Sequence, residues 1–217
     1  MNSTNPLFIA FEGIDGCGKS TQAQILADKL RSAGHLVHVT CEPTDSPIGS
    51  LIKSIFRHQY EADHRTIAGL FVADRLDHLL NKPNGILKKM EEGYFVICDR
   101  YYFSSYAYQS VHMPMEWVIH ANSLSAGMLR PNLNIFIDID PELSIGRINR
   151  DRSNPELYET LDNLRKVRAK YFEAFEILKS EERVFISDGN RPVQDIASQL
   201  WKEVFALTGS HPIESIE

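Results

Sequence analysis

The stretch Gly13-Ile14-Asp15-Gly16-Cys17-Gly18-Lys19-Ser20 decides the fold of this chain, because it joins an apolar run to a helical pattern. It matches the spacing of a glycine, four residues and then Gly-Lys-Ser/Thr, in the strand–loop–helix context that this motif requires. The glycines let backbone N–H groups turn toward phosphate oxygens, and the following helix points its positive end at the same place. The stretch therefore predicts a phosphate-binding loop, rather than a glycine-rich turn that happens to contain a lysine.

Two side chains of this loop have specific expected roles. Lys19 is expected to reach the β- and γ-phosphates of ATP and to act in catalysis, and the Ser20 hydroxyl can bind Mg²⁺. Lys19 is the only cation of the loop, which contains no arginine. The predicted ATP-binding residues of the loop are Gly13, Ile14, Asp15, Gly16, Cys17, Gly18, Lys19, Ser20 and Thr21.

Cys17 has two interpretations. A cysteine near a helix N-terminus can have a lowered pKa, which would make the protein sensitive to oxidation or alkylation. The residue can equally be a passive small side chain at a variable position of the loop.

Strand and helix patterns alternate along the whole chain. The predicted strands, several of them near-continuous apolar runs typical of buried parallel strands, are 7–12, 36–41, 94–99, 134–140 and 183–187. The predicted helices are 20–32, 48–57, 65–80, 116–129, 141–151, 161–180 and 192–207. This alternation predicts an α/β protein, with a five-stranded parallel sheet flanked by helices in three layers, as a single domain over residues 1–217.

Composition restricts the function classes. The 217 residues carry a formal charge of −6, and an acidic chain is a poor candidate for coating nucleic acid. Three cysteines without CxxC spacing, and eight histidines without metal spacing, support neither a disulfide framework nor a zinc site. The N-terminal sequence is not typical of a signal peptide, and no apolar stretch is long enough to span a membrane, so a cytoplasmic protein without a membrane partner is expected.

The apolar run 94–99 ends in Asp99, which Arg100 follows. A strand that ends in an acid is where phosphate-loop proteins place the carboxylate that organises Mg²⁺. The alternative is a strand-end aspartate that caps a turn. A carboxylate beside a guanidinium could hold a metal ion and a second phosphate side by side, which predicts two phosphorylated substrates.

Several segments together resemble the thymidylate kinases. FEGIDGCGKSTQ, EPTDSPIG, LFVADR, DRYYFSSYAYQ and RINRDR followed by YE occur in the order and approximate spacing of that family, across nearly the whole chain. The resemblance implies a P-loop NTPase fold with strand order 2-3-1-4-5. It also implies transfer of the ATP γ-phosphate to dTMP, giving dTDP and ADP in dTTP biosynthesis. Mg²⁺ and a homodimer, formed through the helices around 48–80 and 116–129, are implied as well.

The resemblance assigns an expected role to each acceptor-site residue. Asp15 accepts the deoxyribose 3′-hydroxyl, Phe71 stacks on thymine, and Arg75 donates to the O4 carbonyl, which suits thymine or uracil because arginine carries only donors. Arg100 binds the dTMP phosphate, and Tyr158 crowds the 2′ position of the sugar. The implied dTMP-binding residues are Asp15, Glu42, Pro43, Phe71, Arg75, Arg100, Ser104, Ser105, Tyr108, Gln109 and Tyr158, and the implied metal ligands are Ser20, Asp99 and Glu159.

An arginine-rich segment, about 147–159, resembles the lid of the family members that supply a catalytic arginine from the lid. Phosphoryl transfer spreads negative charge over the equatorial oxygens, so a positioned cation carries much of the catalysis. Arg150 or Arg152 is expected to reach the transferring phosphate, and Arg147 to pack against adenine. A run of solvated arginines is the other interpretation of the same residues.

One departure and two alternatives remain open. Many bacterial relatives carry arginine where this chain has Cys41, so any contact from that arginine is missing or supplied elsewhere. The nearest alternative function is another nucleotide kinase, acting on dUMP, dCMP or a nucleoside. A different class is a regulatory ATPase or switch without a small-molecule acceptor.

Overall fold

The sheet is parallel and has the strand order expected from the family resemblance. The computed structural model describes residues 5–151 and 156–208. Its five-stranded sheet has the order β2-β3-β1-β4-β5, so β1 pairs with β3 on one side and with β4 on the other. The strands are β1 (Phe8–Glu12), β2 (Val37–Cys41), β3 (Phe95–Asp99), β4 (Leu133–Asp138) and β5 (Val184–Asp188).

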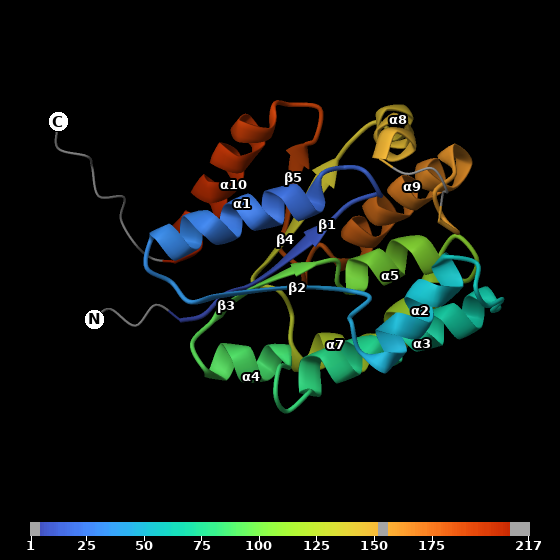
Figure 1. Ribbon diagram of the computed structural model, residues 1–217, viewed down its shortest axis with the longest axis horizontal. Coiled ribbons are helices and arrows are strands. Elements are labelled where there is room, and N and C mark those ends of the chain that lie inside the picture. The colour runs from blue at the N-terminus through green and yellow to red at the C-terminus, as the bar shows by residue number, and fades with distance from the viewer. Residues whose placement is uncertain (1–4, 152–155, 209–217) are drawn as a thin grey trace.

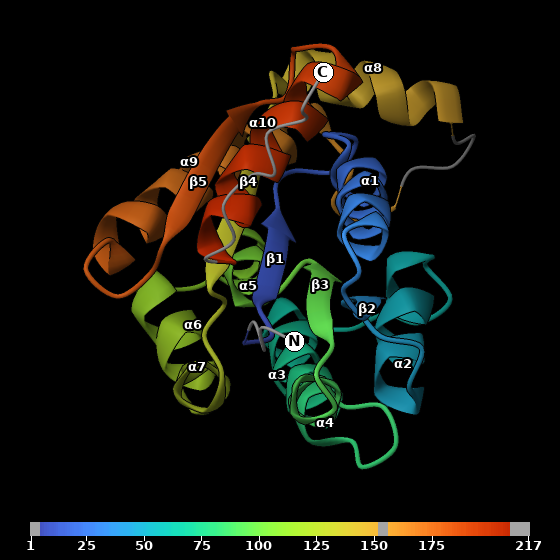
Figure 2. The same cartoon turned by 90° about the vertical axis from the view of Figure 1, so that its left-hand side faces the viewer.

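Helices cover both faces of this sheet. On one face α1 lies beside α10, and α1 also packs on β1 and β3; on the other face α5 packs against α9, and α4 against β3 (Figures 1 and 2). Among the described residues the helices are α1 (Lys19–Ser32), α2 (Pro47–Phe56), α3 (His64–Leu80), α4 (Ile86–Glu91), α5 (Tyr102–Gln109), α6 (Met115–Ala121), α7 (Ser123–Met128), α8 (Pro141–Asp151), α9 (Leu161–Leu178) and α10 (Val193–Leu207). This is the three-layer α/β arrangement predicted for the chain.

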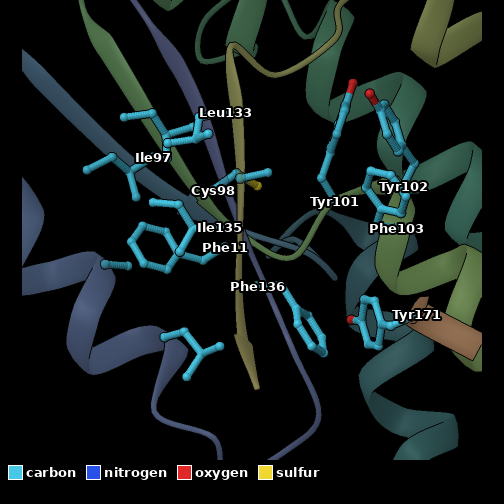
Figure 3. Packing of buried hydrophobic residues seen from close by; sticks show 14 of the residues in the cluster. Phe11, Ile97, Cys98, Tyr101, Tyr102, Phe103, Leu133, Ile135, Phe136 and Tyr171 are labelled. Carbon is cyan, nitrogen blue, oxygen red and sulfur yellow. The ribbon is translucent and has the colours of Figure 1, made fainter. Parts of the chain in front are cut away.

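The core consists of apolar side chains that alternate between the two faces of the central strands. Figure 3 shows Ile135 on the same side of β4 as Phe11, whereas the next residue, Phe136, points toward Tyr171 of α9. The Phe136 and Tyr171 ring centroids are 4.8 Å apart. Strands buried on both faces need apolar residues at every position, which explains the continuous runs in the sequence.

One predicted helix differs from the structure, and two helices of the structure were not predicted. The prediction of a single helix over 116–129 is wrong. This segment forms two helices, α6 and α7, which are separated at Asn122. Two short helices, α4 and α5, were not expected. All eight residues of α5 are buried, so it has no polar stripe from which a helical period could be recognised.

The helices α2 and α3 begin at side-chain caps. Ser46 accepts a hydrogen bond from the Gly49 N–H (3.2 Å) at the start of α2, and Asp63 accepts one from the Arg65 N–H (2.9 Å) at the start of α3. Such caps satisfy backbone donors that have no partner within the helix. They fix where α2 and α3 begin, and both helices then extend along the site.

Candidate active site

The loop between β1 and α1 has the backbone that a phosphate cradle needs. Gly13 has φ 144°, a conformation that side chains rarely adopt, and a Cβ there would lie 2.7 Å from the Cys17 sulfur and 2.8 Å from the Ile137 carbonyl oxygen. Ser144 of α8 donates to the Asp15 carbonyl oxygen and so ties the loop to that helix. The loop therefore requires glycine for both conformation and space.

Lys19 and Ser20 open α1 at the cavity. The Lys19 ammonium donates to the Ile14 carbonyl oxygen (3.0 Å), and the Ser20 hydroxyl donates to the Asp99 carboxylate. Asp99 lies here because β3 pairs in parallel with β1, with Phe11 opposite Asp99. A hydroxyl and a carboxylate in contact at a helix N-terminus are the hard oxygen ligands that Mg²⁺ prefers, so these residues fit that ion.

Arg100 is the most connected cation of the site. It has φ 74°, a strained conformation for a residue with a side chain, and its guanidinium turns back over the phosphate loop. It donates to Asp15 Oδ1 (2.5 Å), the Gly13 carbonyl oxygen (3.0 Å) and the Ser104 hydroxyl (3.1 Å). The second Asp15 oxygen accepts from Tyr108 (2.7 Å). The structure thus brings five predicted site residues together, with the ion pair of Arg100 and Asp15 at their centre.

Nearby positive charges decide the protonation state of the Asp15 carboxyl group. Burial alone would raise the pKa of its carboxyl group, but the positive charges of Arg100 and Lys19 and the hydrogen bond from Tyr108 outweigh it and hold that pKa below its usual range. Asp15 is therefore an anion at neutral pH, able to accept a hydroxyl group or to neutralise a guanidinium.

Glu12 is a buried carboxylate that sequence reasoning missed. It is fully buried at the end of β1, where it accepts from the Tyr101 N–H (2.9 Å), the Ser104 hydroxyl (2.6 Å) and the Tyr171 hydroxyl (3.0 Å). Burial raises the pKa of this carboxyl group, although these hydrogen bonds and Arg100 oppose the shift. An acid inside an apolar strand was the available signal, and its role is to anchor the β3–α5 turn beneath Arg100.

Arg75 lies behind the cavity wall. It is 1% exposed and forms a buried ion pair with Glu42, with Nη2–Oε2 at 2.6 Å. Its Nη1 group donates to Ser105 (3.1 Å) and to Asn122, so four of its five N–H groups have partners among the described residues. Ser105 and Glu42 line the cavity in its place.

Glu42 also accepts from His78, at 3.0 Å. Ligand atoms of Glu42, His78 and Cys98 lie within 4.8 Å of one another, which is close enough to bind a metal ion. The Arg75 guanidinium and the His78 imidazole already pair with this carboxylate, so the group is a satisfied hydrogen-bond network.

Phe71 and Gln109 lie at the same wall. Phe71 is 9% exposed, and its ring packs 5.9 Å from that of Phe56. Gln109 is 2% exposed, and its amide oxygen has no hydrogen-bond partner among the described residues. A buried acceptor without a donor costs free energy, and Gln109 is also one of the residues that line the cavity.

One cavity of about 790 Å³ connects these parts. Residues that sequence reasoning missed also line it, including Lys53 of α2, Arg57 at the end of α2, Gly189 and Arg191 of the β5–α10 loop, and Val193 at the start of α10. Their signal was positional, because loops at the carboxyl ends of parallel strands form the site in such folds. The predicted residues that line it are Asp15, Gly16, Cys17, Gly18, Lys19, Ser20, Thr21, Glu42, Pro43, Phe71, Asp99, Arg100, Ser104, Ser105, Tyr108, Gln109, Arg147, Arg150, Tyr158 and Glu159.

The lid arginines differ in placement. Arg147 donates to the carbonyl oxygens of Gly16 and Gly189, each at 3.4 Å, and so bridges the phosphate loop and the β5–α10 loop. Arg150 is exposed and donates to the Gly146 carbonyl oxygen (3.2 Å) of its own helix. Arg152 lies outside the described residues. Glu159 lines the cavity and accepts from the Glu156 N–H (2.7 Å).

The structure contradicts the lowered pKa considered for Cys17. The residue is 2% exposed, and burial raises the pKa of its thiol despite the charges of Lys19 and Arg100. The thiolate is the nucleophile, so a raised pKa makes the thiol less reactive than a free cysteine at neutral pH. Cys98 is likewise buried with a raised pKa, whereas Cys41 is exposed in the cavity wall.

Iodoacetamide at pH 7.5 is therefore expected to label Cys41 first, and Cys17 and Cys98 only after unfolding. Peptide mass spectrometry measures the order, with Cys41→Ser as the control that removes the accessible thiol. Rapid labelling of Cys17 in the folded protein would contradict the placement of its side chain.

The comparisons with known proteins agree with this geometry. The family model described as "Thymidylate kinase" matches residues 11–200. A "Probable thymidylate kinase" of Caldivirga maquilingensis is 38% identical over 89% of this chain and 91% of its own length. Proteins with the same description are 39% identical in Pyrococcus horikoshii, over 78% of this chain and 83% of the relative, and in Pyrobaculum aerophilum, over 89% and 93%. In the described part of the chain, helices with the length and hydropathy to cross a bilayer are absent.

Proposed function

The chain belongs to the thymidylate kinase family, whose enzymes phosphorylate dTMP to dTDP with ATP as donor, and we propose how its residues divide this work. The observation that carries the proposal is the single cavity, which joins a phosphate loop to a second polar pocket around Arg100 and Gln109. A regulatory ATPase or switch has no use for a second pocket, so the geometry supports a two-substrate transfer within this cavity.

On the donor side, the loop N–H groups and Lys19 bind the ATP phosphates, and Arg147 packs against adenine. The contacts of Arg147 support this role, because they join the phosphate loop to the β5–α10 loop. Ser20 and Asp99 would hold Mg²⁺, and Glu159 would support them. When bound, the ion supplies positive charge to the β- and γ-phosphate oxygens.

On the acceptor side, Arg100 binds the dTMP phosphate and Asp15 the 3′-hydroxyl. Their ion pair supports the assignment, since it holds both groups at the cavity beside the phosphate loop. Arg150 or Arg152 then reaches the transferring phosphate as the lid closes and excludes water. Single alanine substitutions at Arg147, Arg150 and Arg152 separate these roles by their effects on kcat and on the KM for ATP.

The thymine base lies between Phe71 and Gln109. The unpartnered Gln109 oxygen supports this position, because thymine and uracil present an N3–H donor whereas cytosine presents an acceptor there. Ser104, Ser105 and Tyr108 complete the pocket together with Glu42 and Pro43. Arg75 lies behind this wall, so in place of the expected contact with the O4 carbonyl we propose that it positions Ser105 and Glu42, to which it donates.

An assay of ADP release with ATP and Mg²⁺ tests this assignment. We expect dTMP to give the highest rate, dUMP the second, and dCMP, dGMP and no acceptor far lower rates. Gln109→Met is expected to lower kcat/KM for dTMP by about 10-fold or more, since it removes an acceptor for a buried donor. The preference for dTMP over dCMP should fall with it.

The exposed Gln194 on α10 gives a matched control. Gln194→Met should change neither kcat/KM for dTMP nor the preference for dTMP over dCMP. ADP release that ignores every monophosphate would show that the acceptor pocket has been misread. If the ratio of the kcat/KM values for dTMP and dCMP is unchanged in Gln109→Met, Gln109 does not recognise the base, but the rest of the proposed function is not affected.

We also propose a homodimer, formed through α2, α3 and the α6–α7 pair. Large apolar side chains exposed on these helices support it, namely Leu51, Leu80, Trp117, Leu124 and Met128. Scattered apolar side chains are ordinary on a surface, but several on neighbouring helices favour an interface. Sedimentation velocity tests this proposal. We also propose a cytoplasmic location, as the thymidylate kinase family implies.

A further inference from the structure

Three aromatic rings from distant parts of the sequence meet where Tyr158 lines the cavity. His64 begins α3, His112 lies in the turn after α5, and Tyr158 follows α8. The two imidazole rings stack with their centroids 3.5 Å apart and an interplanar angle of 1°. The Tyr158 hydroxyl is hydrogen-bonded to His64 Nδ1 at 3.2 Å, and its ring centroid lies 5.8 Å from that of His112.

The remaining contacts of Tyr158 leave its ring little freedom. Its side chain lines the cavity and is 6% exposed, and Phe56 meets it edge-on with centroids 5.3 Å apart. The adjoining backbone is fixed as well, because the Leu157 N–H donates to the Phe56 carbonyl oxygen (3.3 Å) and Asn163 donates to the Tyr158 carbonyl oxygen (2.9 Å). The hydrogen bond to His64 fixes the far end of the ring.

The two histidines lie at the surface, outside the main hydrophobic core. His64 is half-buried and His112 is exposed, and the cap of α3 is Asp63 rather than either of them. Desolvation, then the nearby His64 and Lys166, lowers the pKa of His112, so this ring is neutral near pH 7 and stacks on its neighbour without charge repulsion. Nothing in the folding of the core requires this pair.

We propose that His64 and His112 are positioning residues for Tyr158, and that through this ring they set the discrimination between deoxyribose and ribose in the acceptor nucleotide. The inference rests on the proposed function, in which Tyr158 crowds the sugar 2′ position. A ring held on three sides cannot move away from a 2′-hydroxyl, whereas a ring that has lost its hydrogen bond and its stacked neighbour can swing aside. Steric selection against one small group is worth about 10–200-fold, so loosening the ring removes part of that factor.

The experiment compares dTMP with ribothymidine 5′-monophosphate, which has the same base and adds only the 2′-hydroxyl. The readout is the ratio of the two kcat/KM values in the ADP-release assay. In H64A/H112A we expect this ratio to fall about 5–10-fold through a gain of ribonucleotide activity, with the KM for ATP unchanged. His64→Asn, which keeps a polar group near the Nδ1 position, should restore most of the ratio relative to His64→Ala.

His120→Ala provides the matched control, because His120 is an exposed histidine of α6 that does not line the cavity. An unchanged ratio in H64A/H112A, or an equal fall in His120→Ala, would overturn the proposal. So would an unchanged ratio in Tyr158→Ala, because Tyr158 would then not face the sugar.

Thermal unfolding checks that the variants fold. If H64A/H112A unfolds, His64→Phe takes its place, because it keeps an aromatic ring in the stack and removes only the hydrogen bond. A lowered ratio of the two kcat/KM values in this variant would support the proposal, and an unchanged ratio would overturn it. Failure of the proposed function would look different, since the wild-type protein would then release no ADP in response to dTMP.

Discussion

Replacing Arg100 by methionine is expected to lower kcat/KM for dTMP by about 10³-fold, the loss that follows removal of one pre-positioned cation from a transition state. The guanidinium occupies the junction between the phosphate loop and the acceptor pocket, where it contacts Asp15, Gly13, Ser104 and Tyr108. Methionine preserves much of the side-chain volume and removes every donor. Steady-state kinetics with dTMP as the varied substrate measures the effect.

The same substitution is expected to destabilise the fold, because it leaves the Asp15 carboxylate without its partner. The two side chains are 15% and 29% exposed, so solvent screens part of their attraction, and a loss of about 1–3 kcal/mol is expected. Urea unfolding measures it.

The double variant R100M/D15N separates the two effects. It should recover much of the stability, since no unpaired charge remains, but none of the activity. Recovery of activity in the double variant would show that Arg100 serves only to neutralise Asp15. A kcat/KM within tenfold of wild type in Arg100→Met would remove Arg100 from acceptor binding.

Replacing Lys19 by methionine should lower kcat by about 10³-fold with little change in stability, because the ammonium is the cation that the loop itself offers to the transferring phosphate. In the structure this group donates to one carbonyl oxygen, that of Ile14, and lies 3.7 Å from the Cys17 sulfur. An ammonium group has three donors, so donors remain for phosphate oxygens.

Lys202→Met is the matched control, since Lys202 is exposed on α10, and it should retain wild-type kcat. Circular dichroism should give the same spectrum for both variants. A kcat for Lys19→Met within tenfold of wild type would mean that the lid arginines, rather than the loop lysine, carry the charge stabilisation.

Arg100→Met and Lys19→Met are also expected to change different kinetic parameters. Arg100→Met is expected to raise the KM for dTMP strongly, because the acceptor phosphate binds Arg100 in the ground state as well. Lys19→Met acts mainly on kcat, since its charge matters most where the γ-phosphate develops its transition-state charge.

The sequence by itself determined the strands and the phosphate loop, and its resemblance to a family supplied the strand order and most residues of the cavity wall. Continuous apolar runs identify strands covered on both faces, and Gly13 to Ser20 has a spacing that few other structures use. These are local signals: a strand, a glycine loop and a helix N-terminus depend mainly on residues next to one another in the chain. Asp99 was also predicted from a local signal, because it is the acidic residue at the end of its own apolar strand.

Only the tertiary structure decided which predicted side chains face the cavity and which lie behind it. Phe71 and Arg75 share a helical face, yet Phe71 lines the cavity and Arg75 is buried against Glu42, which lies 33 positions away in the sequence. Glu12 has its partners on the β3–α5 segment and on α9, and Tyr158 has His64 and His112. Helical and strand periods specify which face a residue occupies but not what packs on that face, so burial, ion pairing and pKa at these positions depend on contacts between distant segments.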